Sequence, residues 1–370
     1  MNILILNWRD TKNPQAGGAE QITERYADYW SKKGAKVFWI SNVFSKSEGN
    51  EVIKDIHIIR VGPYLSRTTI LNLFSYPLFL LNVIIQARKI IKEKRIDFII
   101  DEIHGLPFFT PILFTQKKVL LVCEVAGEIW DKMWPFPVNI IGKFLEKIIF
   151  QIYGRTEMWA ISENTRSDIL KLNANANVKI LPLGIDIKKY PILSKTKFPS
   201  AVFVARLVPM KGIEDAIDAA LKISKDLVDF KLFVIGRGTE EYECFLKNKV
   251  NELKLNSVVI FLGYVSEEDK YKYLSESHFL IHPSYKEGFG LTVLEAGLVG
   301  TPSIVKKGSS LDELVNNGED GFIVHSGDEL AEKFIENITS TDKLNKNAKL
   351  KAEEYSWELK LKESDNITGI

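Results

Sequence analysis

Two glutamates in the stretch 286–297, KEGFGLTVLEAG, carry the clearest chemical signal in the chain. Glu287 and Glu295 flank a glycine-rich turn that runs into an apolar helical segment. The start of that helix would direct free backbone N–H groups and its positive dipole end at a ligand over Gly288 and Gly290, which suits a phosphate. Glu295, expected in the first helical turn, could accept hydrogen bonds from a ribose, and Glu287 could accept them from an attached sugar. The alternative is that both are ordinary charges at a loop and a helix start.

Two cations lie in a second segment, VARLVPMKG, between a predicted strand and the next helix. Arg206 could bind a diphosphate as a planar fork and Lys211 as a point charge, so together they could neutralise a departing nucleoside diphosphate. Surface charge on a loop is the commoner fate of such residues. No convincing Asp-x-Asp motif for a metal is present.

Two further glycine-rich turns follow predicted strands. Gly236-Arg237-Gly238 resembles a dinucleotide fingerprint, but the third glycine is missing because position 241 is Glu, and Gly-x-Gly by itself is weak evidence. Gly17 and Gly18 precede a predicted helix, whose N–H groups could meet an anion or a sugar oxygen. These two glycines could equally serve only to ease a tight loop.

Together, the block EGFGLTVLEAGLVGTPSIV, the segment VARLVPMKG and the turn GGAE resemble family 4 glycosyltransferases. The donor site of that family carries two glutamates separated by seven residues, the spacing of Glu287 and Glu295. The resemblance covers nearly the whole chain and is most specific from 201 to 324. It implies a retaining hexosyltransferase that uses a nucleotide diphosphate sugar, a glycan or lipid-linked acceptor, and no metal or other cofactor.

The same resemblance assigns roles to individual residues. Arg206, Lys211 and Glu287 are expected to be catalytic. The donor is expected to be bound by Gly17, Gly18, Gly236, Gly263, Tyr264, Val265, Gly288, Phe289, Gly290, Leu291, Thr292 and Glu295.

The sequence departs from the family pattern in its first half. Many members carry a histidine after the strand that corresponds to Val119–Val122, whereas this chain has Cys123 followed by Glu124. Cys123 is expected to be a small buried hydrophobe and not a nucleophile. His104 or Glu124 could supply polar contacts in the cleft instead, although His104 could equally be structural. His282 is expected to be structural.

Strands and helices alternate along the chain, so the fold class is predicted to be α/β with the GT-B architecture, two Rossmann-like doubly wound domains facing across a cleft. Residues 1–183 are expected to form the acceptor-side domain, with a helix of about 352–370 crossing back to it. Residues 184–351 are expected to bind the donor. Ser162 and Ser266 are predicted to cap helices, and a helix is predicted over 311–316.

Composition narrows the function. A length of 370 residues predicts two domains, and the net charge of +1 gives no argument for nucleic-acid binding. Two widely separated cysteines and the lack of a signal-peptide pattern predict a cytoplasmic protein. The uncharged segment 68–87 is not expected to span a membrane, because polar residues interrupt it and Pro77 should break a helix there.

The stretch 140–153 combines Lys143 and Lys147 with bulky apolar residues at helical spacing. A helix docked on the core is the favoured interpretation. If the acceptor is lipid-linked, peripheral contact of this helix with the inner face of the membrane is the alternative.

Two other functional classes stay open at this stage. A catalytically silent protein that binds nucleotide sugars is one, and Cys123 in place of the usual histidine is the best argument for it. An oxidoreductase that uses NAD is the other, although the incomplete glycine fingerprint and the second matching half argue against it.

Overall fold

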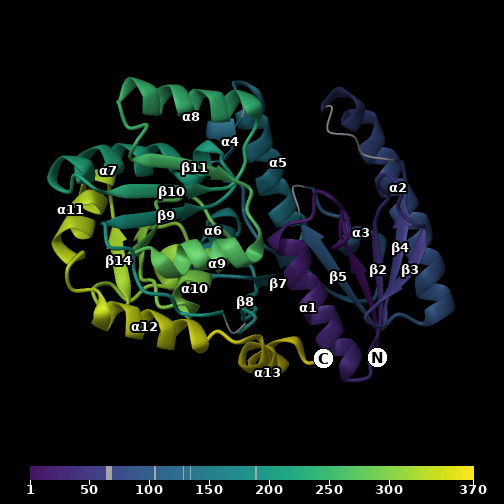
Figure 1. Ribbon diagram of the computed structural model, residues 1–370. Coiled ribbons are helices and arrows are strands. Elements are labelled where there is room, and N and C mark those ends of the chain that lie inside the picture. The colour runs from purple at the N-terminus through teal and green to yellow at the C-terminus, as the bar shows by residue number, and fades with distance from the viewer. Residues whose placement is uncertain (64–68, 104–105, 128, 134, 188–189) are drawn as a thin grey trace. The chain divides into compact units, whose positions relative to one another are not determined.

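The computed structural model describes residues 1–63, 69–103, 106–127, 129–133, 135–187 and 190–370. The chain folds into two α/β units, shown in Figure 1. The first unit comprises Met1–Pro182 and takes back the end of the chain, Leu361–Ile370. The second unit comprises Leu183–Lys360. Each unit has its own sheet and its own core.

The first unit is built on an eight-stranded sheet in the order β3-β4-β2-β1-β5-β6-β7-β8. Neighbouring strands are parallel except for the antiparallel edge pair of β3 and β4. The strands are β1 (Asn2–Leu6), β2 (Lys36–Asn42), β3 (Asn50–Ile53), β4 (Ile56–Val61), β5 (Phe98–Ile103), β6 (Lys117–Val122), β7 (Glu157–Ala160) and β8 (Val178–Ile180).

Helices cover both faces of this sheet. Phe98 of β5 lies against Trp159, whose ring is 6.3 Å from that of Trp30 in α1, whereas the adjacent Ile99 packs with Val83 of α2. Successive strand residues point to opposite faces, so α1 and α2 lie on opposite sides of the sheet. The helices of this unit are α1 (Gly18–Lys32), α2 (Thr69–Lys94), α3 (Thr110–Leu113), α4 (Ile129–Met133), α5 (Val138–Ile152), α6 (Glu163–Leu172) and most of α13 (Trp357–Thr368).

The second unit is built on a six-stranded parallel sheet in the order β11-β10-β9-β12-β13-β14. Its strands are β9 (Ser200–Val204), β10 (Lys231–Ile235), β11 (Val259–Gly263), β12 (Phe279–His282), β13 (Ser303–Lys306) and β14 (Gly321–Val324). Its helices are η1 (Pro209–Lys211), α7 (Ile213–Asp226), α8 (Glu240–Glu252), α9 (Glu267–Glu276), α10 (Leu291–Leu298), η2 (Leu311–Glu313), α11 (Gly327–Asn337) and α12 (Asp342–Glu353).

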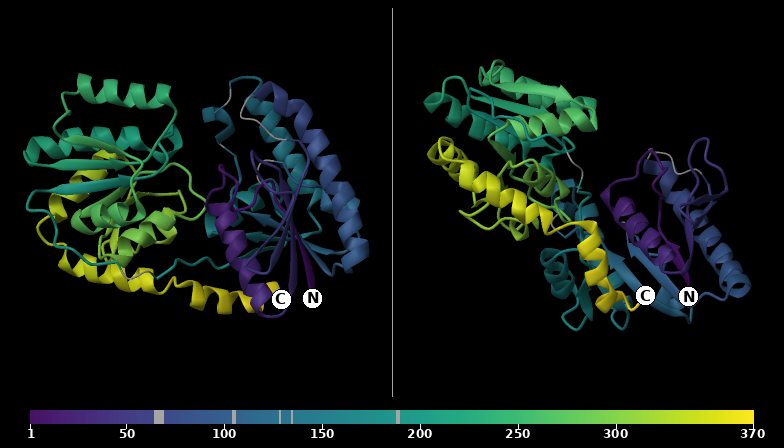
Figure 2. Two further views of the ribbon diagram at one scale, coloured as in Figure 1. Left: turned by 45° about the vertical axis from the view of Figure 1, so that its right-hand side comes forward. Right: turned by 60° about the horizontal axis from the view of Figure 1, so that its bottom comes forward.

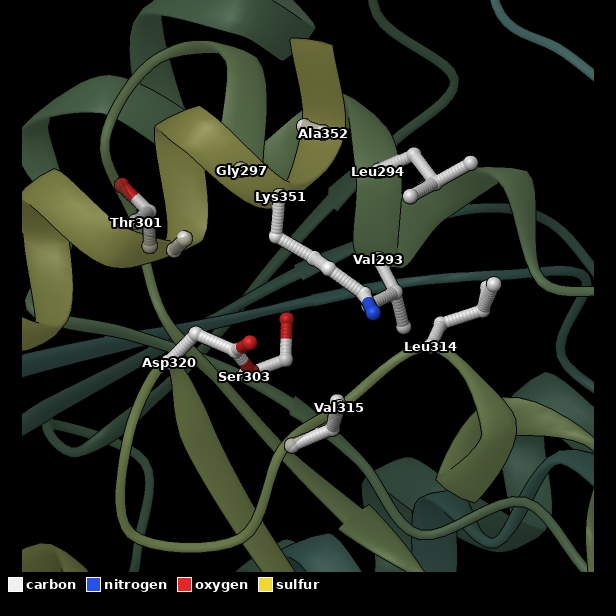
Figure 3. Close-up of a pocket in the computed structure, with 11 residues that line it drawn as sticks. Val293, Leu294, Gly297, Thr301, Ser303, Leu314, Val315, Asp320, Lys351 and Ala352 are labelled. Carbon is white, nitrogen blue, oxygen red and sulfur yellow. The ribbon is translucent and has the colours of Figure 1, made fainter. Parts of the chain in front are cut away.

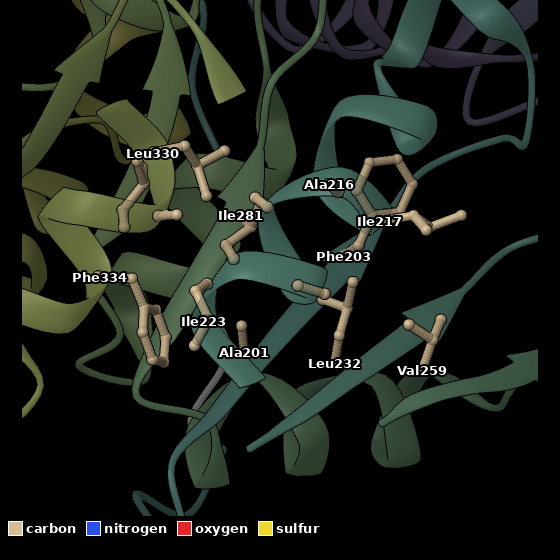
Figure 4. Close-up of a cluster of buried hydrophobic side chains, with 14 of the residues drawn as sticks. Ala201, Phe203, Ala216, Ile217, Ile223, Leu232, Val259, Ile281, Leu330 and Phe334 are labelled. Atoms are coloured by element: carbon tan, nitrogen blue, oxygen red, sulfur yellow. The ribbon is translucent and has the colours of Figure 1, made fainter. Parts of the chain in front are cut away.

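Two separate hydrophobic clusters, one on each face, hold the second sheet. Ala201 and Phe203 of β9 pack with side chains of α7 and α11, as Figure 4 shows. Val202 and Val204, which alternate with them along β9, pack with α9, α10 and α12 on the other face. The prediction of doubly wound α/β domains is therefore confirmed, and the turned views of Figure 2 show helices on both sides of each sheet.

The predictions for helix caps and helix bounds were partly right. The hydroxyl groups of Ser162 and Ser266 accept N–H bonds at the starts of α6 and α9, as expected. The helix predicted over 311–316 is only the short 3-10 turn η2. Pro77 was expected to break a helix, but α2 continues through it. The buried Phe79, Val83 and other side chains of α2 pack against the sheet, which offsets the one backbone hydrogen bond that proline removes.

Among the described residues, no helix combines the length and the apolar character that crossing a membrane requires. This includes α2, which contains most of the uncharged segment 68–87.

Candidate functional site

The loops after β9 and β12 lie where the strand order of the second sheet reverses. Neighbouring strands on one side of this point are β9, β10 and β11, and those on the other side are β12, β13 and β14. In an open parallel sheet, the two loops at such a point leave in opposite directions, and ligands bind at the carboxyl ends of the strands there. The loop after β9 carries Arg206 and Lys211, and the loop after β12 carries Glu287.

Hydrogen bonds fix these two loops to each other. The N–H of Tyr285 donates to the carbonyl oxygen of Met210 over 2.9 Å, and the hydroxyl of Ser284 donates to the same oxygen over 3.0 Å. Gly212 has φ +71°, and a Cβ there would lie 2.1 Å from the carbonyl oxygen of Pro283. The close approach therefore needs glycine at this position, and it brings together segments far apart in sequence.

Lys211 and Glu287 form an ion pair at this point. Lys211 Nζ lies 2.7 Å from Glu287 Oε1, and both side chains are largely buried. His282 Nε2 lies 3.2 Å from the same oxygen, although this contact lacks the geometry of a regular hydrogen bond. Burial would raise the pKa of Glu287, but the close approach of His282 and the charge of Lys211 outweigh it and lower the pKa to about 2. Glu287 is therefore an anion that can accept hydrogen bonds at neutral pH.

The second glutamate lies on α10. Gly290 precedes the helix in a left-handed conformation, with φ +107°. Glu295 is the fifth residue of α10 and so lies in its second turn, which corrects the expectation of the first turn. The helix starts at Leu291 as predicted, but with 3.6 residues per turn its fifth residue already lies beyond the first turn. Glu295 Oε1 accepts from Lys270 Nζ of α9 over 2.7 Å.

Arg206 differs from Lys211 in its surroundings. Its side chain is exposed at the end of the β9 strand, and no ion pair of its guanidinium is recorded within the described part of the chain. Since the nearby Glu287 is already paired with Lys211, Arg206 keeps its charge available for an anion.

The loops after β10 and β11 continue the same edge of the sheet. The N–H of Gly236 donates to the carbonyl oxygen of Gly263 over 2.8 Å, and a Cβ on Gly236 would lie 1.8 Å from the carbonyl oxygen of Ala205. These contacts bring the ends of β9, β10 and β11 together. Tyr264 is 86% exposed, whereas Val265 packs against the core below it. Phe289 also packs against this core, so its ring supports the glycine-rich loop.

The remaining expected site residues lie in the first unit. Gly17 caps α1, and its N–H donates to Glu20 Oε2 over 2.6 Å, so Gly18 begins the helix. Glu124 is exposed just after β6. His104 lies outside the described residues.

Cys123 is a buried thiol, as expected. Burial raises its pKa well above the ordinary range, and the charge of Glu102 adds to the effect. Its Sγ lies 3.9 Å from Glu102 Oε1. A thiol with a raised pKa is a poor nucleophile, because the thiolate is the reactive form.

Glu102 and Glu20 form a buried carboxyl cluster that the sequence analysis did not single out. Both side chains are fully buried, and Asn7 Nδ2 and Thr23 Oγ1 each donate to Glu102 Oε2 over 2.6 Å. Burial raises the pKa of Glu102 to about 8, and the charge of Glu20 adds to it. Glu102 lies near the end of β5 and Glu20 in the first turn of α1, so the cluster lies where the strand order of the first sheet reverses between β1 and β5.

The signals for the missed residues differ in strength. Glu102 follows Asp101 inside the strand FIIDEI, all of which is buried, so two acids within an apolar run could have identified it. Lys270 lies on the polar helix α9, among several other charged residues, and nothing local distinguishes it.

A small pocket lies between α10, α12 and the segment that follows η2 (Figure 3). Val293, Leu294 and Gly297 of α10 line it, with Lys351 of α12 and Asp320. Arg206, Lys211, Glu287 and Glu295 do not line it. It is therefore separate from the residues that converge at the sheet edge.

Comparisons with protein families cover nearly the whole chain. A family model described as glycosyltransferase family 4 matches residues 16–189, and one described as glycosyl transferases group 1 matches residues 185–355. A glycosyltransferase of Methanocaldococcus jannaschii is 28% identical over 282 residues, 70% of this chain and 70% of that protein. The alpha-monoglucosyldiacylglycerol synthase of Acholeplasma laidlawii is 24% identical over 251 residues, 63% of each chain.

Solved structures with the same fold include sucrose-phosphate synthase from Thermosynechococcus elongatus. Its TM-score is 0.82 at 17% identity, with 99% of this chain and 98% of that chain covered. The Anabaena protein HepE, solved with UDP and glucose, has a TM-score of 0.73 at 17% identity and full coverage of both chains. At this identity the likeness concerns the fold, which is the GT-B architecture.

Proposed function

The chain belongs to the family 4 type of glycosyltransferases with the GT-B fold, and from this premise we propose that it is a retaining hexosyltransferase. The proposed donor is a nucleotide diphosphate sugar, and the proposed acceptor is a hydroxyl group of a glycan or a lipid-linked sugar. The observation that carries the proposal is the convergence of Lys211, Glu287 and the start of α10 at the reversal of the second sheet.

Positive groups from the loop after β9 and from the start of α10 would hold the diphosphate. Arg206 and Lys211 supply two cations, and the backbone N–H groups at Leu291 and Thr292 supply the unsatisfied donors of a helix start. Such preorganised groups stabilise the charge that develops on a departing diphosphate. Because these cations can take that charge, the proposal includes turnover without a divalent metal.

The two glutamates would hold the neutral parts of the donor. Glu287 stays ionised at neutral pH, so it can accept hydrogen bonds from sugar hydroxyls while Lys211 turns one N–H toward a phosphate oxygen. Glu295, oriented by Lys270, can accept bonds from the ribose. Gly236, Gly263, Tyr264 and Val265 would lie beside the base, where the first two allow close approach of the backbone.

In the proposed front-face reaction, the bond between the anomeric carbon and the phosphate oxygen breaks as a bond to the acceptor oxygen forms on the same face. The acceptor proton passes to the departing phosphate oxygen. A side-chain base is then unnecessary, so Cys123 in place of a histidine is compatible with turnover. The buried thiol still favours one second candidate, a protein that binds nucleotide sugars without turnover.

Names of relatives support a nucleotide-sugar donor and leave the acceptor open. HepE was solved with UDP, which makes UDP-sugars the first donors to test. The Acholeplasma relative is named for a glucosylated diacylglycerol, which makes a lipid-linked acceptor one class to include.

Thermal unfolding with UDP-, GDP- and ADP-sugars and NAD, all in chelator, tests the donor site. A ligand at about 100 times its Kd should add about 2.7 kcal/mol to the free energy of unfolding. Glu295→Ala and Arg206→Ala should each weaken binding about 10- to 100-fold, because each removes a charged hydrogen-bonding group. Glu336→Ala and Arg166→Ala, whose side chains are 59% and 43% exposed and which are distant in sequence from the site, serve as controls.

The outcomes separate the candidates. A shift with one nucleotide class and turnover on a glycan or lipid-linked acceptor support the transferase. Binding without turnover over a broad acceptor panel favours the silent binder. Wild-type affinity in both site variants contradicts the site, and a shift with NAD alone contradicts the proposal as a whole.

A further inference from the structure

Three helices of the first unit, α2, α3 and α5, lie on the same face of its sheet. Ile99, Asp101 and Ile103 alternate along β5 and therefore point to one side. Ile99 packs with α2, and Ile103 packs with α5. Asp101, between them, accepts a 2.8 Å bond from Thr110, the first residue of α3, and a bond from Tyr153 at the end of α5. The three helices thus form one layer, of which α2 comes forward in the left view of Figure 2.

The outer side of this layer is apolar. In α5, Ile149 and Phe150 are buried against the sheet, yet the opposite side carries bulky apolar residues as well. Phe144 of α5 is 63% exposed, Ile85 of α2 is 59% exposed and Ile112 of α3 is 68% exposed. We call the full set the apolar ridge; it consists of Leu78, Leu81, Ile85, Ile112, Ile140, Ile141, Phe144, Leu145 and Ile148.

An apolar ridge of this kind differs from ordinary surface composition. Single exposed apolar residues are common and need no explanation. Many large ones gathered on one face mark a surface that contacts something else. The helix expected to dock on the core therefore does so with one side only, and its second apolar side remains without a partner in the described structure.

Charge at the ridge is mainly positive. The end of α2 carries four exposed cations and one acid in the sequence ARKIIKEK, with Arg88 and Lys89 nearest the ridge. In α5, Glu146 is turned inward, where its carboxylate accepts N–H bonds from Ala126 at 2.7 Å and Gly127 at 2.9 Å.

The lysines of α5 remain at the surface. Lys143 pairs with the exposed Asp131 of α4, and Lys147 lies one turn further along. The net result is an apolar surface bordered by positive charge.

We propose that the apolar ridge docks on an anionic lipid bilayer, with α2, α3 and α5 lying at the level of the headgroups. Apolar side chains would enter the boundary of the acyl region while the bordering cations contact negative headgroups. A second copy of the chain fits less well, because a two-fold contact through the ridge would bring the positive borders of both copies together. The proposal does not depend on the donor site, which lies in the second unit.

Vesicle flotation of the full chain tests the proposal. The probes are phosphatidylcholine vesicles and vesicles containing about one-third phosphatidylglycerol, each at low and high salt. The wild type should float with the anionic vesicles and much less with the neutral ones. Arg88→Gln/Lys89→Gln should lower partitioning about 30-fold, since each basic residue near an anionic surface contributes about a fivefold effect.

Removing apolar area tests the other part of the surface. Ile141→Ser/Phe144→Ser should lower partitioning at least about tenfold, because two large side chains no longer enter the lipid. Val228→Ser, which removes an 83% exposed apolar residue from the second unit, is the matched control. Lys343→Gln/Lys346→Gln on α12 is the control for charge. Both controls should bind vesicles as the wild type does.

The proposal is overturned if the wild type ignores anionic vesicles or if the controls lose as much binding as the ridge variants. It is also overturned if sedimentation shows a wild-type dimer that Ile141→Ser/Phe144→Ser dissociates without vesicle binding, since a second copy would then cover the ridge. Unchanged urea unfolding of the ridge variants, followed by tryptophan fluorescence, shows that their first unit is folded, because six of the seven tryptophans belong to it. If the wild type binds no nucleotide sugar, the proposed function fails, but the vesicle measurements still test the apolar ridge independently.

Discussion

Replacing Glu102 by glutamine should stabilise the first unit at alkaline pH. Glu102 is fully buried beside Glu20, and burial raises its pKa to about 8. Glutamine resembles the protonated acid in shape and keeps one oxygen for the bonds from Asn7 and Thr23. It removes the ionisation without removing these contacts.

The size of this stabilisation follows from the pKa of Glu102 in the unfolded chain and in the folded chain. Below the ordinary value of 4.5, the carboxyl is protonated in both the folded and the unfolded chain, and its contribution to stability is fully present. As the pH rises, the unfolded chain loses the proton first, so the free energy of unfolding falls by about 1.4 kcal/mol per pH unit. The fall continues to the folded pKa of about 8 and amounts to about 5 kcal/mol. Between pH 6 and 8, where the slope falls as the folded group begins to ionise, Glu102→Gln should gain about 2 kcal/mol on the wild type.

Urea unfolding followed by tryptophan fluorescence measures this difference. Six of the seven tryptophans belong to the first unit, so the signal reports mainly on the unit that contains Glu102. Glu93→Gln removes an exposed carboxylate of α2 and should show no such trend. A constant difference between Glu102→Gln and the wild type from pH 6 to 8 would show that Glu102 is already ionised in the folded protein and would refute the reasoning.

Two further predictions concern the second unit. Lys270→Met should weaken UDP binding about tenfold but 2′-deoxy-UDP binding little, because Lys270 pairs with Glu295, the proposed acceptor of hydrogen bonds from the ribose. Equal loss for both ligands in calorimetric titration would contradict that role. Gly290→Ala should lower stability by more than about 2 kcal/mol, because a Cβ at φ +107° would lie 2.2 Å from Leu311 Cδ2. Gly308→Ala is the control in thermal unfolding, because φ is also positive there, at +82°, but no atom lies within 4 Å of an added Cβ. An equal loss of stability in both variants would exclude the clash with Leu311 as the cause.

Much of the fold was predictable because its signals are local. Short apolar strands separated by helical stretches indicate parallel α/β units, and the caps at Ser162 and Ser266 depend only on neighbouring residues. Predictions failed where tertiary packing overrode a local rule. Pro77 does not end α2, because the helix is held by its buried side, and η2 is too short to form the helix that its composition suggested.

The sequence by itself determined which residues could bind a donor. The glycines, Glu287, Glu295, Arg206 and Lys211 stand in short segments whose types and spacing carry the chemistry. Only the tertiary structure decided how these groups are paired, since Lys211 meets Glu287 and Lys270 meets Glu295 through contacts between separate loops and helices.

Burial was likewise decided by the tertiary structure. The same sequence pattern can be buried or exposed. This holds both for an acid inside a strand and for a helix with two apolar sides. The packing of neighbouring elements made Glu102 a buried acid and left Phe144 exposed. The physical reason is that periodicity defines the faces of an element, whereas contacts distant in sequence decide what covers each face.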